Sequence, residues 1–367
     1  MEIQEREVIG EKEVAGLERL RRQVYGDDPR APVVFEGALK KDLGREEFQG
    51  RQRLFLAIRE GELVAAVVAR YPAGLTLEEA SVGTVGFFEG LEDEEAVGAV
   101  LREAVAWLRE QGAQVVVGPM NGDTWHEYRF NLGPFEAPPF LKEPYNREYY
   151  PRLWEQSGFE LLMGYHTRRV EGREALEELR SYHRPRWEEV KAAGYKVEAM
   201  VHRPMQEVLE RVYRMSREVF TDAFLYRPID EASFVKLYEG AEVLLEEKLS
   251  FLLIGPKGED AGFAFVFPDY ARAVAAMRGK KNLLAKLRFW LNRERQTANI
   301  KTVGVMPAHR GKGLSSAMAY LYLDGIIESG FEAANMCLIS DGNISARADT
   351  GVGEVLRRYG LYRWRES

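Results

Sequence analysis

The 367-residue chain contains one cysteine, Cys337, and only five histidines. A single cysteine excludes an intrachain disulfide, and none of the histidines has the paired spacing of a metal site. The first residues, MEIQEREVIGEKEV, are charged where a secretory signal would be apolar. No segment offers the ~20 consecutive apolar residues of a membrane span. These absences predict a cytoplasmic protein with no bound metal and no transmembrane helix.

Excess positive charge is also missing, because 58 acidic residues outnumber 51 basic ones and give a net charge of −7. This balance disfavours nucleic acid as a partner. Hydrophobic residues make up 46% and charged residues 30%, as in a globular protein. The length favours two domains. Abundant Glu and Arg with little Asn, Gln or Cys is a tendency of thermophilic proteins.

The hydrophobic pattern predicts the same series of elements twice. The first series contains a helix at 16–25, a hairpin at 53–71, a strand at 81–89, a long helix at 93–111, a strand at 113–120, a helix at 147–157 and a strand at 159–170. A charged helical connector follows. The second series contains a strand at 195–201, a helix at 205–220, a hairpin at 250–268, a strand at 298–306, a helix at 314–330, a strand at 333–339, a short helix near residue 346 and a strand at 355–364.

This duplication predicts an α/β (α+β) chain of two domains. We expect one domain at residues 1–170, a connector at 171–194, and a second domain at 195–367. Each would hold a mixed, mostly antiparallel sheet flanked by helices.

The stretch VGVMPAHRGKGLSSAMAYL, residues 303–321, places a basic, glycine-rich turn between a strand and a helix. A P-loop needs four residues between its first Gly and Gly-Lys-Ser/Thr, whereas six separate Gly304 from Gly311. A dinucleotide fingerprint needs Gly or Ala where Ser316 stands. A third possibility is the pyrophosphate loop Arg/Gln-x-x-Gly-x-Gly/Ala of acyl-CoA transferases, and a fourth is a tight turn that caps a core helix.

The pyrophosphate loop is the best match, over Arg310, Gly311, Lys312, Gly313, Leu314 and Ser315. A helix N-terminus has unpaired N–H groups and partial positive charge, and glycines keep side chains away from a diphosphate. With the strand before it and Asn343 after the next strand, the segment resembles the GNAT superfamily of N-acetyltransferases. The whole chain resembles bacterial tandem GNAT-like proteins whose substrates are not defined.

The resemblance implies that acetyl-CoA or another acyl-CoA binds to the second half. Backbone groups of Val303 and Val305 would contact the acyl-pantetheine arm, and the N–H groups of 310–315 would hold the pyrophosphate. Asn343 and Ser345 would lie near the sulfur. In the first half the corresponding turn is acidic, VGFFEGLEDEEAVGAV, and would repel a diphosphate. The first half therefore resembles a GNAT domain that has lost its cofactor.

Catalysis needs a proton donor for the departing thiolate and a group that orients the amine. The family's usual tyrosine is replaced here by Thr350. Tyr359 and Tyr362 are candidate donors, with strand packing as the alternative. Asp269 is a candidate for orienting the amine, with a turn role as the alternative.

Two further segments have more than one interpretation. The loop GPMNGDTWHEYRF contains Asn121, Trp125, His126 and Tyr128, and would either line the acceptor pocket between the halves or cap an element. The insertion at 271–296 is basic with an apolar stripe. It would be a solvated helix, a cover over the cofactor phosphates, a site for an acidic acceptor or a membrane contact.

The favoured function is therefore acyl transfer to a small-molecule or peptide amine. A sensor or scaffold that binds acyl-CoA without turnover is the main alternative. A Fem-type aminoacyl transferase has support only from the basic insertion. The sequence does not identify the acceptor or the oligomeric state.

Overall fold

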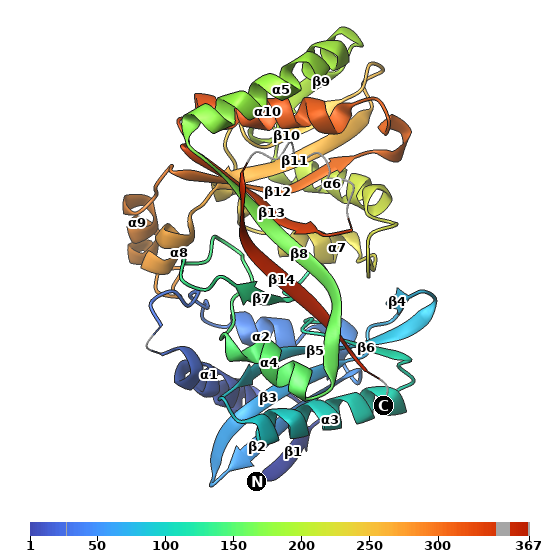
Figure 1. Ribbon diagram of the computed structural model, residues 1–367, viewed down its shortest axis with the longest axis vertical. Helices are drawn as coiled ribbons and strands as arrows, with labels where there is room; N and C mark the ends of the chain where they lie inside the picture. Colours follow the sequence, from blue (N-terminus) through green and yellow to red (C-terminus); the bar gives the residue numbers. More distant parts are fainter. Residues whose placement is uncertain (27, 343–352, 366–367) are drawn as a thin grey trace.

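The computed structural model describes residues 1–26, 28–342 and 353–365 (Figure 1). In the first half the elements are β1 (Glu2–Arg6), α1 (Glu11–Tyr25), α2 (Ala38–Leu43), β2 (Gln52–Arg59), β3 (Glu62–Arg70), β4 (Thr76–Leu77), β5 (Ala80–Gly90), α3 (Glu94–Glu110), β6 (Val115–Gly118), β7 (Phe130–Gly133), α4 (Tyr149–Gln156) and β8 (Phe159–Glu171). In the second half they are α5 (Arg173–Ala192), β9 (Lys196–Ala199), α6 (Met205–Val219), α7 (Glu231–Leu237), β10 (Phe251–Ile254), β11 (Asp260–Pro268), α8 (Ala271–Ala276), α9 (Leu283–Leu291), β12 (Thr297–Val305), α10 (Leu314–Glu328), β13 (Ala333–Ser340) and β14 (Glu354–Trp364). The expected duplicated α/β series is therefore present, except that the short helix expected near residue 346 lies outside the described residues.

All the described strands join one sheet, in the order β1-β2-β3-β5-β6-β14-β8-β13-β12-β11-β10-β9, with β4 added to β5 and β7 added to β14. Most pairs are antiparallel, whereas β5 with β6 and β12 with β13 are parallel. The fold class expected from the sequence is thus confirmed.

The halves exchange their last strands. β8 ends the first series but pairs with β13 of the second, whereas β14 ends the chain and pairs with β6 of the first. Between these contacts β8 and β14 pair antiparallel, from Glu354 opposite Arg169 to Trp364 opposite Phe159. Figure 1 shows the two long strands crossing side by side from one half to the other. The sheet therefore crosses the expected domain boundary, and the division at 171–194 stays a prediction.

The helices, in contrast to these strands, pack within their own halves. In the first half α4 packs against α3, and in the second α5 packs against α10. α5 occupies the segment expected as a connector, yet it covers one face of the second half (Figure 1). It is joined to α10 by an ion pair of 3.0 Å between Arg180 and Asp324 and by Trp187 stacked on Tyr320.

Separate apolar cores lie in the two halves. In the first, α3 buries Val97, Val100 and Leu101 against β2 and β3. Their spacing places the three side chains on one face of a helix, which explains why this segment is helical and why that face is buried. In the second, Leu314 and Met318 of α10 belong to a buried cluster with residues of α5, β11 and β12. Each core fixes the position of a strand-to-helix turn.

The parallel strand pairs separate after a few residues in both halves. β5 pairs with β6 only from Val82 to Thr84, and β12 pairs with β13 only from Thr297 to Ile300. A bulge precedes the free end of each longer strand, since the register shifts between Ala66 and Val68 opposite β5 and between Phe265 and Val266 opposite β12. The turn before each long helix therefore follows a strand that has left its partner. Among the described helices, none is long and apolar enough to cross a membrane.

Candidate functional site

The turn between β12 and α10 leaves the helix N-terminus open. Gly311 and Gly313 have φ of 77° and 78°, a conformation that side chains disfavour. A Cβ at Gly311 would meet no atom within 4 Å. Gly313 caps α10 without a side-chain hydrogen bond, and the first turn of the helix has no acidic residue. The first backbone bond of the helix joins Ala317 N–H to Gly313 O, at 3.1 Å, so the preceding N–H groups are not used within the helix.

A cavity of about 370 Å³ opens at this turn. It is lined by Arg186, Val305, His309, Arg310, Gly311, Gly313, Leu314, Ser315 and Ser316. Arg186 comes from α5 and lies over Gly313, where an added Cβ would approach its Cδ to 2.2 Å. The cavity therefore combines a free helix N-terminus with guanidinium groups from two elements, a combination that favours an anion.

Two buried histidines, His183 and His309, hold the turn in place through hydrogen bonds. His183 of α5 hydrogen-bonds Ser316 through Nδ1 at 2.7 Å, and burial lowers the pKa of this histidine. His309 is buried, with Nδ1 2.9 Å from the hydroxyl of Tyr195. Arg310 donates to the carbonyl of Val219 at 3.0 Å. These contacts fix the turn to α5 and to the end of α6.

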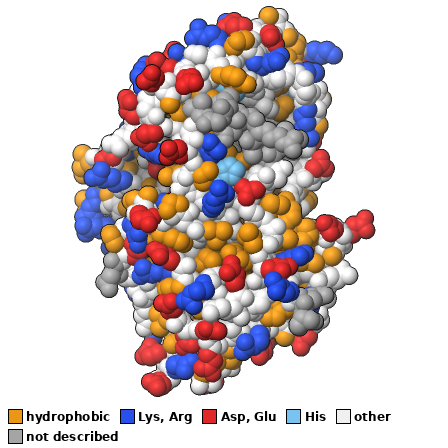
Figure 2. Space-filling model, viewed as in Figure 1, with side chains coloured by type: hydrophobic (Ala, Val, Ile, Leu, Met, Phe, Trp, Pro, Cys, Tyr) orange, Lys and Arg blue, Asp and Glu red, His pale blue; other side chains and the backbone are white. Residues whose placement is uncertain are grey.

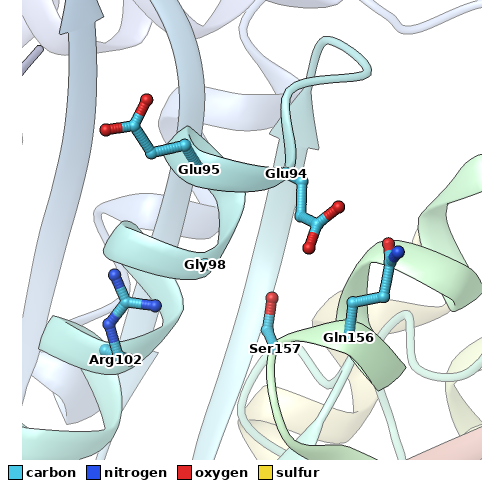
Figure 3. A pocket seen from close by; sticks show the side chains of 6 residues that line it. All are labelled: Glu94, Glu95, Gly98, Arg102, Gln156 and Ser157. Atoms are coloured by element: carbon cyan, nitrogen blue, oxygen red, sulfur yellow. The ribbon is translucent and has the colours of Figure 1, made fainter.

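The same turn is closed in the first half. Asp93 caps α3 by accepting a hydrogen bond from Ala96 N–H at 3.0 Å, and Glu94 and Glu95 occupy the first turn. A cavity of about 350 Å³ lies there between α3 and α4. Figure 3 shows Glu94 pointing toward Gln156 of α4, so a carboxylate stands at the N-terminal end of this cavity.

The backbone groups at the free end of β5 are also hydrogen-bonded within the protein. Gly90 N–H donates to the hydroxyl of Tyr150 at 3.1 Å, and its carbonyl accepts from the hydroxyl of Tyr149 at 2.9 Å. The Glu89 carboxylate accepts from Tyr150 at 2.8 Å and forms an ion pair with Arg21. Two tyrosines of α4 thus use the backbone groups that a ligand would need here.

Comparison with solved structures gives the fold. A tandem GNAT protein from the clavulanic acid biosynthesis pathway matches with a TM-score of 0.51 and 13% identity, over 100% of both chains. The chain has the tandem GNAT fold. A GCN5-related glucosamine N-acetyltransferase region of a fungal multidomain β-N-acetylglucosaminidase matches at TM-score 0.55 and 11% identity, covering 99% of this chain and 38% of that one. A probable N-acyltransferase from Enterococcus faecalis matches at TM-score 0.52 and 12% identity, covering 99% of this chain and 72% of the other.

Sequence comparison is less informative. Protein YghO of Escherichia coli is 26% identical over 145 residues, which cover 37% of this chain and 36% of YghO. The aligned region thus spans little more than a third of that relative. No family model matches the chain.

Within the GNAT fold, the predicted pantetheine-contacting residues lie on the free end of β12. Val303 and Val305 pair with Ala264 and Gly262 of β11 on one side. On the other side, no described strand pairs with β12 beyond Ile300. Their backbone groups on that edge are therefore placed to meet a ligand. Asn343, Ser345 and Thr350 lie outside the described residues.

The two tyrosines predicted as proton donors are hydrogen-bonded to carboxylates, and their catalytic role stays a prediction. Tyr362 is buried in the core of the first GNAT half, and its hydroxyl donates to Glu155 at 3.1 Å. Tyr359 is buried between the halves, where its hydroxyl is bonded to Glu143 and lies 3.0 Å from Thr167 Oγ1. Burial raises the pKa of both hydroxyls. Strand exchange explains both positions, because β14 pairs with β6 and β7 of the first half.

Asp269 connects the two halves through hydrogen bonds. Its Oδ1 accepts from Leu141 N–H at 2.9 Å and from Ala271 N–H at 3.2 Å, and burial raises the pKa of this carboxyl. The carboxylate thus ties the loop after β7 to the start of α8. This geometry favours the turn role over contact with an amine.

The aromatic loop at 121–128 also lies where the two halves contact each other. Asn121 accepts from Phe87 N–H at the bulge of β5, at 2.7 Å. Trp125 donates to the carbonyl of Arg227 in the second half at 2.7 Å. The other two predicted pocket residues face neighbours as well, His126 on Asp123 at 2.6 Å and Tyr128 against Tyr165. A wall of an acceptor pocket stays a prediction, since neither cavity described above includes these residues.

Two titratable groups near the separated strands were not singled out from the sequence. Lys301, at the bulge of β12, donates to the carbonyl of Lys142 at 3.1 Å and lies 5.2 Å from the ring of Phe140. Burial lowers its pKa to about 8. His166 of β8 is 2.6 Å from Asp341, 175 residues away in the chain. The strand alternation could have flagged Lys301, whereas nothing local signals the His166–Asp341 pair.

Proposed function

We propose that this chain is an acyl-CoA-dependent N-acyltransferase with acetyl-CoA, or another acyl-CoA, as donor and an amine as acceptor. The second half binds the cofactor, and the first half shapes the acceptor side. The supporting observation is the turn before α10, where two left-handed glycines and an uncapped helix N-terminus border a cavity with basic side chains. The residues present fit a diphosphate, because no carboxylate stands in that turn.

Each part of the site has a role in this proposal. The backbone N–H groups of Arg310 to Ser315 hold the pyrophosphate, and Arg186 and Lys312 add positive charge. The backbone of Val303 and Val305 receives the pantetheine arm along the free edge of β12. When bound, acyl-CoA supplies a thioester carbonyl open to attack by an amine. Asn343 and Ser345, expected near the sulfur, lie outside the described residues.

Lys301 is the group we propose for proton transfer from the acceptor amine. It stands two residues before Val303 on β12, under residues 140–142 of the first half. A lysine with a pKa of about 8 is partly neutral near neutral pH and can accept a proton from an ammonium group. This assignment also gives the first half a part in the acceptor site.

The test of cofactor binding is calorimetric titration with coenzyme A of wild type, Gly311→Asp and Gly311→Asn. Asp and Asn tolerate the left-handed backbone about equally, so the pair differs chiefly in one negative charge. We expect Asp to weaken binding at least tenfold relative to Asn, because the space above Gly311 is open to the ligand. Equal affinities for the two variants would remove the diphosphate site from this turn.

Turnover is tested separately by release of free thiol from acetyl-CoA with a panel of amines. A sensor that binds acyl-CoA without transfer is the second candidate, favoured by the engagement of Tyr359 and Tyr362 with carboxylates. Binding with no thiol release for any amine would support the sensor. Release that depends on one amine class would support the enzyme.

A further inference from the structure

The helix α9 exposes an unusual amount of apolar surface. Five of its nine residues are large, apolar and more than half exposed: Leu283 at 85%, Leu284 at 54%, Leu287 at 54%, Trp290 at 56% and Leu291 at 75%. Single exposed apolar residues are common on proteins, but a contiguous group marks a contact surface. The surrounding fold leaves these side chains uncovered.

The arrangement of α9 separates an inner face from an outer one. Ala285 and Phe289 are buried, and Phe289 packs with Tyr270 and Ala273. At about 100° per residue, the five exposed side chains fall within an arc of roughly 120° on the opposite side. Lys286 and Arg288 border this arc on its two edges. The helix is therefore anchored by one face and presents the other outward.

Positive charge surrounds the apolar arc. Residues 271–296 contain eight basic residues and one acidic residue, Glu294, in a chain whose net charge is −7. Glu294 is paired with Arg272 at 2.5 Å, and Arg295 is paired with Glu246 at 3.0 Å. No ion pair among the described residues engages Arg278, Lys280, Lys281, Lys286 or Arg288. Figure 2 shows blue side chains gathered at the left edge of the molecule, where Figure 1 places α8 and α9.

The tryptophan of this face is placed at its border. The guanidinium of Arg293 lies 3.6 Å from the ring centroid of Trp290. A tryptophan next to a cation at the edge of an apolar face suits the boundary between acyl chains and headgroups. Val34 of the first half, 43% exposed, lies next to the same region, because Glu36 N–H bonds the carbonyl of Gly279 at 3.0 Å.

We propose that α9 and its basic flanks, residues 278–295, bind the surface of an anionic lipid bilayer. The apolar arc enters the boundary between headgroups and acyl chains, and the unpaired cations contact acidic headgroups. A second copy of the chain fits less well, because an isologous contact would bring two sets of these cations together. The proposal does not rest on the acyltransferase assignment, since α9 contributes no residue to the cavity at α10.

The experiment is flotation of the full chain with two kinds of vesicle, phosphatidylcholine alone and phosphatidylcholine with about 30% phosphatidylglycerol. We expect binding only to the anionic vesicles, reduced at least tenfold in 0.5 M salt. The variant Leu283→Ser/Leu287→Ser/Leu291→Ser should lose at least tenfold in partitioning. Its matched control, Val8→Ser/Tyr182→Ser/Val243→Ser, removes exposed apolar side chains elsewhere and should bind as wild type.

Charge is tested with Lys280→Glu/Lys281→Glu/Lys286→Glu against Lys191→Glu/Lys236→Glu/Lys257→Glu, which changes net charge equally on other exposed sites. Only the first should abolish flotation. Blue-shifted Trp290 emission, obtained as wild type minus Trp290→Phe, should accompany binding. Equal binding by the two charge variants, or a concentration-dependent dimer in light scattering that the serine variant abolishes, would overturn the proposal in favour of nonspecific adsorption or self-association.

Discussion

The first turns of α3 and α10 occupy the same place in the two halves and have opposite chemistry. Each follows a bulged strand that leaves its parallel neighbour, and each borders a cavity against a flanking helix. In α3 the cap is Asp93 and two glutamates follow, with Arg59 bonded to Asp93 at 2.9 Å and to Glu95 at 2.8 Å. In α10 the cap is Gly313 and no acid follows.

The two helix N-termini differ in stability and in the availability of their backbone N–H groups. Asp93 accepts a hydrogen bond from one N-terminal N–H group of α3, and the glutamates that follow suit the helix dipole, which stabilises the first half. The α10 terminus forgoes this stabilisation, and its N–H groups stay available. A duplicated fold can thus keep one terminus for stability and one for binding.

The largest effect is expected when the first turn of α10 receives an acidic residue at the position that is acidic in α3. Ser315 is exposed at the second helical position, where α3 has Glu95. Ser315→Glu should reduce coenzyme A affinity roughly a hundredfold, since like charges about 5 Å apart repel by roughly 3 kcal/mol at an effective dielectric constant of about 20. The same change should leave the melting temperature equal or slightly higher, because the acid suits the helix dipole.

Ser315→Gln is the matched control for that variant. It adds almost the same bulk without the charge, so its affinity should stay within a few fold of wild type. Titration calorimetry and thermal melting on the same samples give both quantities. If Glu and Gln weaken binding equally, bulk rather than charge closes the site, and the electrostatic contrast between the halves fails.

The sequence predicted the open turn and the duplicated series because both depend on local patterns. Gly311 and Gly313 lie between a β-branched strand and an apolar helix, and the structure places them in the left-handed region. The acidic turn at residues 89–95 was predictable on the same grounds. Periodicity and glycine spacing need no knowledge of distant contacts.

The exchange of β8 and β14 was beyond such reasoning. Their pairing joins residues up to 205 positions apart, such as Phe159 with Trp364, and the composition of the two strands does not tell which half each one pairs with. The burial of Tyr362 in the first half was therefore not predicted, because its strand was expected to belong to the second half and Tyr362 pairs with Gly118 of β6. Lys301 was overlooked for a related reason, since the residues that bury it come from the other half.

A smaller effect, on the free energy of unfolding, is expected when Glu89 at the end of β5 is replaced. Glu89→Ala leaves Tyr150 and Arg21 without their carboxylate, and should lower the free energy of unfolding by about 2 kcal/mol. The figure is modest because the Arg21 side chain is 30% exposed and retains water. Urea unfolding measures the loss. Calorimetry should still find one coenzyme A per chain, because Glu94 and Glu95 remain.

The control for this change is Glu92→Ala, which breaks an exposed pair with Arg152 at 2.5 Å. Exposed pairs contribute little, so stability should change by less than about 0.5 kcal/mol. Two coenzyme A molecules bound to the Glu89→Ala variant, or to wild type, would show that the first half has kept a cofactor site.

The smallest effect concerns the bulge, where β12 has Lys301 and β5 has the apolar Phe87. Burial lowers the Lys301 pKa from 10.5 to about 8, so between these values the folded chain binds fewer protons than the unfolded chain. Stability should therefore rise with pH across this window and be lowest below it. Lys301→Met should remove that rise and add about 1 to 2 kcal/mol at pH 7, discounted for partial exposure of the amine.

Urea unfolding of wild type and Lys301→Met at several pH values from 7 to 10 isolates this group, because all other titrations cancel in the difference. Lys257→Met, at an exposed turn between β10 and β11, should give a difference that does not vary with pH. The acylation rate adds a second readout: if Lys301 accepts the amine's proton, the Met variant loses the rate increase between pH 7 and 9 and keeps its coenzyme A affinity. Parallel stability curves for wild type and Met would mean that Lys301 is hydrated like a surface lysine, and its proposed role at the acceptor side would fall with that result.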